Sequence, residues 1–197
     1  DQTNKFVTRY LQSTHCDLFF ADAAILVEGV AESMLLPHFI RSKFPELYQR
    51  YITILGVNGR HAHRLSPLIE KLCLPTLVIT DLDPAEKEGY HKSVVPKRGE
   101  GQISGNYAIA KWLMKEKDID KLVDYSEDKK EFSFASPYRF SIRLAYQTPV
   151  KVDFEGEEKE AIPGTFEDCL IYTNYDLFKK IKVTDSGNLV EQTHDLL

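Results

Sequence analysis

The apolar residues in the first 80 positions of this chain come in short runs separated by helical patterns. Strand-sized runs occupy Ala23–Val27, Tyr51–Leu55 and Leu74–Thr80. Helical spacing lies between them, around Met34–Phe44 and over Leu65–Leu72. Strands joined by helical crossovers are expected to be parallel, and an open parallel sheet binds its ligands at the carboxyl ends of its strands. The sequence therefore predicts an α/β fold in which a central, mostly parallel sheet is flanked by helices.

Acidic residues follow two of these runs, at the edge where a parallel sheet binds ligands. Glu28 and Glu32 come after the first run, and Asp81 and Asp83 come after the third. Four carboxylates at one edge repel each other unless cations lie between them, and carboxylate oxygens suit Mg²⁺ or Mn²⁺. In an extended Asp-x-Asp segment, both side chains also point to the same face. The pattern predicts a divalent metal site at this edge.

A structural role is the competing interpretation of each acidic motif. Asp81 and Asp83 could be turn and cap residues ahead of a proline, and Glu28 and Glu32 could be solvated acids at a helix start. Either motif alone leaves both interpretations open. Two motifs within one β-α-β-α-β order favour the metal site.

Composition limits the class of protein. The chain has 197 residues, of which 43% are hydrophobic and 28% are charged, as in an ordinary globular domain. No apolar run approaches the roughly 20 residues that a membrane helix needs. The net charge of −5 speaks against a nucleic-acid partner, but a carboxylate cluster stays acidic only until cations fill it. We expect no contact with a membrane.

The cysteines and the first residues point to a cytoplasmic protein. Cys16, Cys73 and Cys169 are odd in number and lack CxxC spacing, which argues against disulfides and against a zinc site. We expect them to be buried thiols. The chain begins at Asp1 without the pattern of a secretion signal, so we expect a piece of a longer, cytoplasmic protein.

Two groups of basic residues lie near the predicted edge. Lys92, Lys97 and Arg98 belong to a charged loop after the third run and could bind DNA phosphates, although a solvated loop is the more common reason for such residues. His61 and His63 follow the second run, and without further ligands at metal spacing they favour surface or phosphate contacts.

The second half of the chain gives fewer signals. We expect a helix over Ile103–Lys115, a strand over Ile142–Tyr146 and a helix that Thr165 caps. Four regions follow from this pattern: a helical lead-in from an upstream domain (1–22), a core (23–116), an insertion (117–140), and the rest of the core with a C-terminal helical segment (141–197).

These segments together resemble a known family. A strand ending in Glu28-Gly29, followed about fifty residues later by one ending in Asp81-Leu82-Asp83, resembles the Toprim domain of topoisomerases, bacterial primases and OLD-family nucleases. Within that set the chain most resembles the C-terminal nuclease half of an OLD (overcoming lysogenisation defect) ATP-dependent endonuclease. Further similar segments are Phe19-Phe20-Ala21, Leu35-Leu36-Pro37, Ser104-Gly105-Asn106, Lys111-Trp112-Leu113, Arg143-Leu144-Ala145-Tyr146-Gln147 and Thr165-Phe166-Glu167-Asp168.

The resemblance implies a DNA endonuclease that cleaves phosphodiester bonds with two Mg²⁺ or Mn²⁺ ions. Its catalytic residues and metal ligands would be Glu28, Glu32, Asp81 and Asp83, and Glu167 would be a further metal ligand. Glu28 would also move a proton. The implied partners are DNA and an upstream ABC-type ATPase domain, which could also hold the full protein in a homo-oligomer.

Two features depart from the family pattern. No Gly-x-x-x-x-Gly-Lys-Ser/Thr loop occurs, so ATP would bind only through the upstream domain. The family also uses a lysine late in its nuclease half, and Lys179, Lys180 and Lys182 are candidates without a matching motif.

Two other functions stay open, namely a Toprim domain of the topoisomerase or primase type and a degenerate Toprim domain that only binds partners. The lack of a zinc ribbon and of room for a DNA-gate domain disfavours the first. The intact acids disfavour the second.

Overall fold

The computed structural model describes residues 16–57, 61–87, 93–135, 137–154 and 156–178. The chain forms two compact units that interleave along the sequence. Unit 1 consists of residues 1–80, 106–117 and 124–146, and unit 2 consists of residues 81–105, 118–123 and 147–197. The four regions expected from the sequence follow chain order instead, and they remain a prediction.

Most of the regular structure lies in unit 1. Its elements are η1 (Cys16–Phe19), β1 (Ala23–Val27), α2 (Val30–Lys43), α3 (Pro45–Tyr48), β2 (Ile52–Gly56), η2 (Ala62–Leu65), α4 (Ser66–Leu72), β3 (Thr76–Ile79), η3 (Ala108–Trp112), η4 (Glu127–Lys130), β6 (Glu131–Phe134) and β7 (Phe140–Ala145). The elements that lie in unit 2 are β4 (Pro84–Ala85), β5 (Ile103–Ser104), β8 (Val150–Phe154), β9 (Glu157–Ala161), α6 (Phe166–Thr173) and α7 (Tyr175–Phe178), together with α5 (Ile119–Asp124) except for its last residue.

The strands of unit 1 form one sheet with the order β2-β1-β3-β7-β6. β1 pairs in parallel with β2 and β3, and β3 pairs in parallel with β7, so that Leu26 lies opposite Leu55 and Val78. Within this sheet only the edge strand β6 is antiparallel. The predicted mostly parallel α/β sheet is confirmed, and its four predicted strands are found within two residues of their expected limits.

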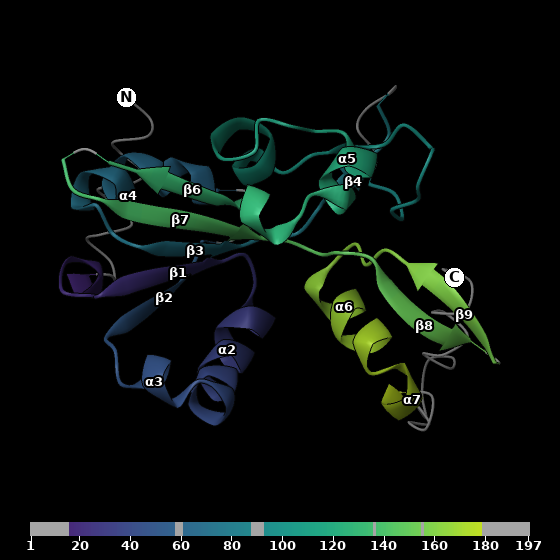
Figure 1. The fold of residues 1–197 in the computed structure, drawn as a ribbon, viewed down its shortest axis with the longest axis horizontal. Coiled ribbons are helices and arrows are strands. Elements are labelled where there is room, and N and C mark those ends of the chain that lie inside the picture. The colour runs from purple at the N-terminus through teal and green to yellow at the C-terminus, as the bar shows by residue number, and fades with distance from the viewer. Residues whose placement is uncertain (1–15, 58–60, 88–92, 136, 155, 179–197) are drawn as a thin grey trace. The chain divides into compact units, whose positions relative to one another are not determined.

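Alternate residues of these strands pack against opposite layers of helices. Ile25 and Val27 pack against Ile40 and Leu36 of α2 on one face of the sheet. Leu26 is fully buried and points to the other face, where α4 lies (Figure 1). Burial of such a side chain stabilises the fold by about 1.5–3 kcal/mol. Because helices cover both faces of the sheet, a ligand reaches it at the carboxyl ends of the strands.

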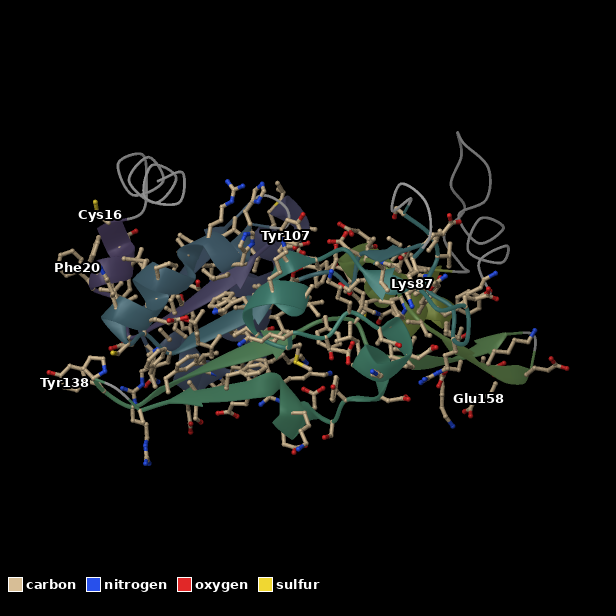
Figure 2. The ribbon with its side chains drawn as sticks, turned by 90° about the horizontal axis from the view of Figure 1, so that it is seen from above. Cys16, Phe20, Lys87, Tyr107, Tyr138 and Glu158 are labelled. Atoms are coloured by element: carbon tan, nitrogen blue, oxygen red, sulfur yellow. The ribbon has the colours of Figure 1, made fainter. Side chains whose placement is uncertain are left out.

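Several predicted details are wrong. The helix expected over Ile103–Lys115 is reduced to the π-helix η3, because the first two residues of that segment pair with β4 as a strand. α2 already begins at Val30, before the helical spacing expected from Met34, so that Pro37 lies inside the helix. Cys16 is exposed (Figure 2), and the other two cysteines are only partly buried.

Unit 2 is built around the two-stranded sheet of β8 and β9. Val152 and Ala161 of these strands pack against Tyr172 and Tyr175 of the two C-terminal helices. The predicted cap of α6 is confirmed, because the Thr165 side chain accepts a hydrogen bond from the backbone of the residue three positions later, within a capping box. None of the described helices is long and apolar enough to span a membrane.

Candidate active site

Glu28 is half-buried and directly follows β1, at the carboxyl edge of the sheet in unit 1. Its Oε1 accepts hydrogen bonds from Thr80 Oγ1 at 2.6 Å and from Asn106 Nδ2 at 2.7 Å. Thr80 and Asn106 are themselves buried and lie 2.8 Å apart at these atoms. Asn106 Oδ1 accepts a hydrogen bond from Ala108 N, which ties the amide to the start of η3. One oxygen of the Glu28 carboxylate is therefore oriented by two neutral donors.

Glu32 lies in the first turn of α2 and is only 3% exposed. A Cβ atom at Gly29 would lie 2.5 Å from Glu32 Oε2, so glycine at this position leaves room for the carboxylate beside the backbone that follows Glu28. The positive end of the helix dipole favours an acid here. Burial of a carboxylate nevertheless costs free energy unless a cation accompanies it. The surroundings of Glu32 therefore fit a bound cation.

Asp81 and Asp83 lie on a segment of unit 2 that Gln147 holds in place. Gln147 is 7% exposed, its Nε2 donates to Asp81 Oδ1, and its Oε1 accepts a hydrogen bond from Leu82 N at 2.8 Å. The Asp83 carbonyl accepts a hydrogen bond from Gly105 N at 2.8 Å. Asp83 has a φ angle of 48°, in the left-handed region that aspartate tolerates better than most residues. The backbone is therefore not extended at Asp83, contrary to the expectation for this Asp-x-Asp segment.

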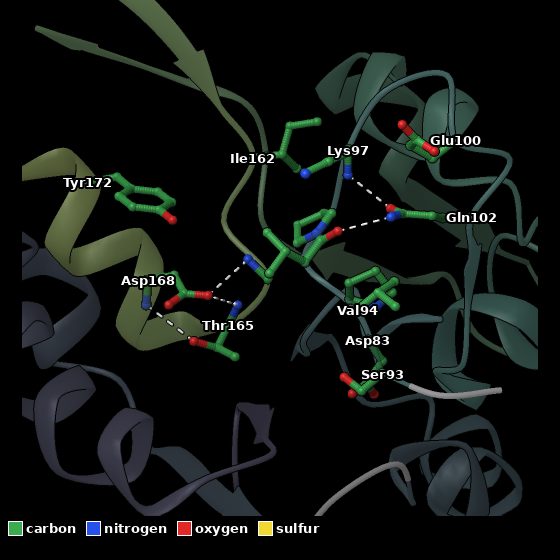
Figure 3. A pocket seen from close by; sticks show the side chains of 14 residues that line it. Asp83, Ser93, Val94, Lys97, Glu100, Gln102, Ile162, Thr165, Asp168 and Tyr172 are labelled. Carbon is green, nitrogen blue, oxygen red and sulfur yellow. Dashed lines mark hydrogen bonds between the residues drawn. The ribbon is translucent and has the colours of Figure 1, made fainter. Parts of the chain in front are cut away.

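Asp83 lines a cavity of about 680 Å³ in unit 2 (Figure 3). Thr165 and Asp168, at the start of α6, line the same cavity. Glu167 lies between them in sequence and is exposed. Unit 2 thus brings Asp83 and the helix start that carries Glu167 to one cavity.

The described residues do not form a ready-made metal cage. Among the residues that the structure describes, no three His, Cys, Asp or Glu side chains are grouped closely enough to hold a metal ion. The assignment of five carboxylates as metal ligands therefore remains a prediction.

The three predicted DNA-binding residues differ in their surroundings. Lys92 lies outside the described residues. Lys97 is exposed and lines the cavity that Asp83 lines. Arg98 Nε lies 2.7 Å from Glu160 Oε1, and this ion pair competes with a DNA phosphate for the guanidinium group. A DNA-binding role for these residues also remains a prediction.

Thr80, Asn106 and Gln147 received no role in the sequence prediction. Each has an uncharged polar side chain that is buried at the end of a strand or before a helix. Their positions in the sequence could have identified Thr80 and Gln147. Each follows a buried parallel strand within two residues and so lies at the edge where the acids were expected. Asn106 had no such signal, because its contact with Glu28 spans 78 residues.

A parallel sheet that carries an acid after β1 and an Asp-x-Asp segment after β3 defines a Toprim-type α/β domain. Residues 19–83 match the family model of the overcoming lysogenization defect protein-like TOPRIM domain, in agreement with the resemblance seen in the sequence.

Over 99% of its length the chain is 27% identical to endonuclease GajA from Bacillus cereus (strain HuB5-5), and it spans 27% of the length of that relative. No solved structure matches the chain significantly.

Proposed function

We propose that this chain carries the active site of an endonuclease that cleaves DNA with the help of divalent metal ions. The observation that carries this proposal is the oriented carboxylate of Glu28, at the carboxyl edge of an OLD-like Toprim domain and followed by the buried Glu32. The identity of 27% with an endonuclease supports the nuclease activity. DNA as the substrate follows from the family resemblance.

Covalent geometry supports a place for Asp81 in the same centre. Asp81 directly follows Thr80, whose hydroxyl donates to Glu28, and consecutive Cα atoms are about 3.8 Å apart. Asp83 comes two residues later. We assign five acids as ligands of Mg²⁺ or Mn²⁺, namely Glu28, Glu32, Asp81, Asp83 and, as a further ligand, Glu167.

Two bound divalent ions would supply an activated water molecule and would offset the negative charge on the leaving oxygen of the phosphodiester. The residues of the chain supply the positioning. Thr80 and Asn106 orient the Glu28 carboxylate, and Gln147 orients Asp81. Glu28 is also our candidate for moving a proton during cleavage.

We further propose that the full-length protein joins this centre to an upstream ABC-type ATPase domain. ATP would bind to that domain and not to this chain, and homo-oligomerisation would occur through the ATPase part.

Cleavage of supercoiled plasmid tests the proposal. With Mg²⁺ or Mn²⁺ the chain should produce nicked and linear DNA, whereas excess EDTA should abolish cleavage and Ca²⁺ should substitute poorly, because it prefers more ligands and longer bonds. Glu28→Gln should be inactive, and Glu46→Gln, which changes an exposed acid of α3, is the matched control. Relaxed closed circles would indicate a topoisomerase instead. Intact plasmid in every condition would indicate a binding module.

A further inference from the structure

Three side chains of unit 1 form a cluster at the residue that follows Asn106. Tyr107 is 41% exposed, and its position is marked in Figure 2. Lys111 Nζ lies 3.9 Å from the centroid of the Tyr107 ring. The His63 ring meets the same ring edge-on, with the centroids 5.4 Å apart. Because Asn106 donates to Glu28, this cluster begins one residue away from the candidate active site.

Two lysines of this region are not neutralised by ion pairs. Lys111 and Lys115 are not buried, and within the described part of the chain neither of them lies within ion-pair distance of a carboxylate. Other basic residues of the protein are paired, such as Lys130 with Glu127. In a chain with a net charge of −5, two such lysines are suited to an anionic ligand.

A groove connects these cations. His63, Lys111 and Lys115 line a cavity of about 510 Å³ together with aromatic side chains that include Trp112 and Phe132. One acid, Glu70, also lines it. Cations interleaved with aromatic rings are typical of surfaces that follow a nucleic-acid strand, since the cations contact phosphates and the rings contact bases or sugars.

We propose that His63, Tyr107, Lys111 and Lys115 bind the phosphate backbone of a DNA strand and lead that strand to Glu28. This assignment deepens the proposed nuclease function and rests on it. Lys111 also lies over Tyr107 at the spacing at which neighbouring side chains stabilise a helix, and that structural role predicts no effect on DNA affinity. The DNA-binding role predicts a specific loss of affinity and of salt dependence.

The experiment measures the binding of a short fluorescein-labelled duplex, and of its single strand, by fluorescence anisotropy in Ca²⁺ over a range of salt concentrations. The double variant Lys111→Gln with Lys115→Gln is compared with Lys43→Gln plus Lys71→Gln, which removes two exposed lysines elsewhere in unit 1. The first pair should weaken binding about tenfold or more. It should also reduce the slope of log affinity against log salt by about 0.9 for each duplex phosphate that the variant no longer neutralises. Lys111→Arg, which keeps the positive charge, should retain much of the affinity of the parent chain for DNA.

The outcomes separate this assignment from the proposed function. If the parent chain binds DNA and both double variants bind it equally well, the groove is not a DNA site, whatever the plasmid assay shows. If the parent chain neither binds nor cleaves DNA, the proposed function fails and the assignment fails with it. Melting temperatures of both double variants show whether a loss of affinity reflects unfolding.

Discussion

Asn106 Nδ2 donates a 2.7 Å hydrogen bond to Glu28 Oε1 across 78 residues of sequence. A hydrogen bond to a charged group contributes about 1.5–3 kcal/mol. We therefore expect Asn106→Ala to lower the metal-dependent cleavage rate by about tenfold to a hundredfold, because the Glu28 carboxylate loses one of its two neutral donors. Thr80→Ser, which keeps the hydroxyl that donates to Glu28, should retain most activity. The cleavage rate as a function of Mn²⁺ concentration measures the effect. Unchanged rates in a folded Asn106→Ala variant would contradict it.

Gln147 should control the geometry of Asp81. Gln147→Glu keeps an acceptor for Leu82 N but replaces the donor to Asp81 with a carboxylate that repels it. We expect this variant to need more metal and to cleave more slowly at neutral pH. It should recover part of its activity as the pH falls and the introduced carboxyl group becomes protonated and able to donate. The test compares the pH profile of cleavage by the variant with that of the parent chain. Parallel profiles would show that the hydrogen bond from Gln147 to Asp81 does not affect cleavage.

Asp81→Asn keeps the shape of the side chain but removes its charge. We expect nearly complete loss of cleavage and weaker Mn²⁺ binding, since a carboxylate between two cations is hard to replace. In EDTA the variant should melt at the same temperature as the parent chain or slightly higher, because the acids that we propose to share the metal centre would repel each other without metal. Plasmid cleavage measures the loss of activity, and thermal melts with and without Mn²⁺ measure metal binding and stability. An active variant would remove Asp81 from the centre, and a much earlier melt would show a structural role alone.

Glu127 holds the ammonium group of Lys130, which is only 1% exposed, in an ion pair of 2.8 Å. Hydrogen bonds from Lys130 and Arg143 lower the pKa of Glu127 below its ordinary value of 4.5. The stabilisation is therefore fully present above about pH 4.5 and is lost as the pH falls through the lowered pKa of the folded state.

Glu127→Gln should consequently melt earlier than the parent chain at pH 7, because it leaves a buried ammonium without its carboxylate. The difference in melting temperature should shrink as the pH falls through the lowered pKa of Glu127, where the parent chain also loses the charge. Glu86→Gln, at an exposed position, is the control and should show little difference at either pH. A difference that stays constant with pH would show that the ion pair does not stabilise the fold.

Much of the fold could be predicted because it is encoded locally. The apolar runs that became β1, β2 and β3 are separated by helical spacing, and this order alone predicts their parallel pairing. The helix expected around Trp112 could not be placed correctly, because pairing of β5 with β4 overrides the local helical preference at its start. Likewise, the left-handed turn at Asp83 is invisible in a motif that reads as the end of a strand.

The sequence by itself determined the α/β class of the domain and predicted which acids form its site. Glu28, Glu32, Asp81 and Asp83 could be named because each follows a strand signal within a few residues, and short-range spacing survives in any fold that forms those strands. Only the tertiary structure decided which neutral side chains orient the acids. Asn106 reaches Glu28 across 78 residues and Gln147 reaches Asp81 across 66, and such contacts depend on how the chain returns to the sheet. Spacing along a sequence records neighbours on one element, whereas hydrogen bonds between distant segments form only after the hydrophobic layers have packed.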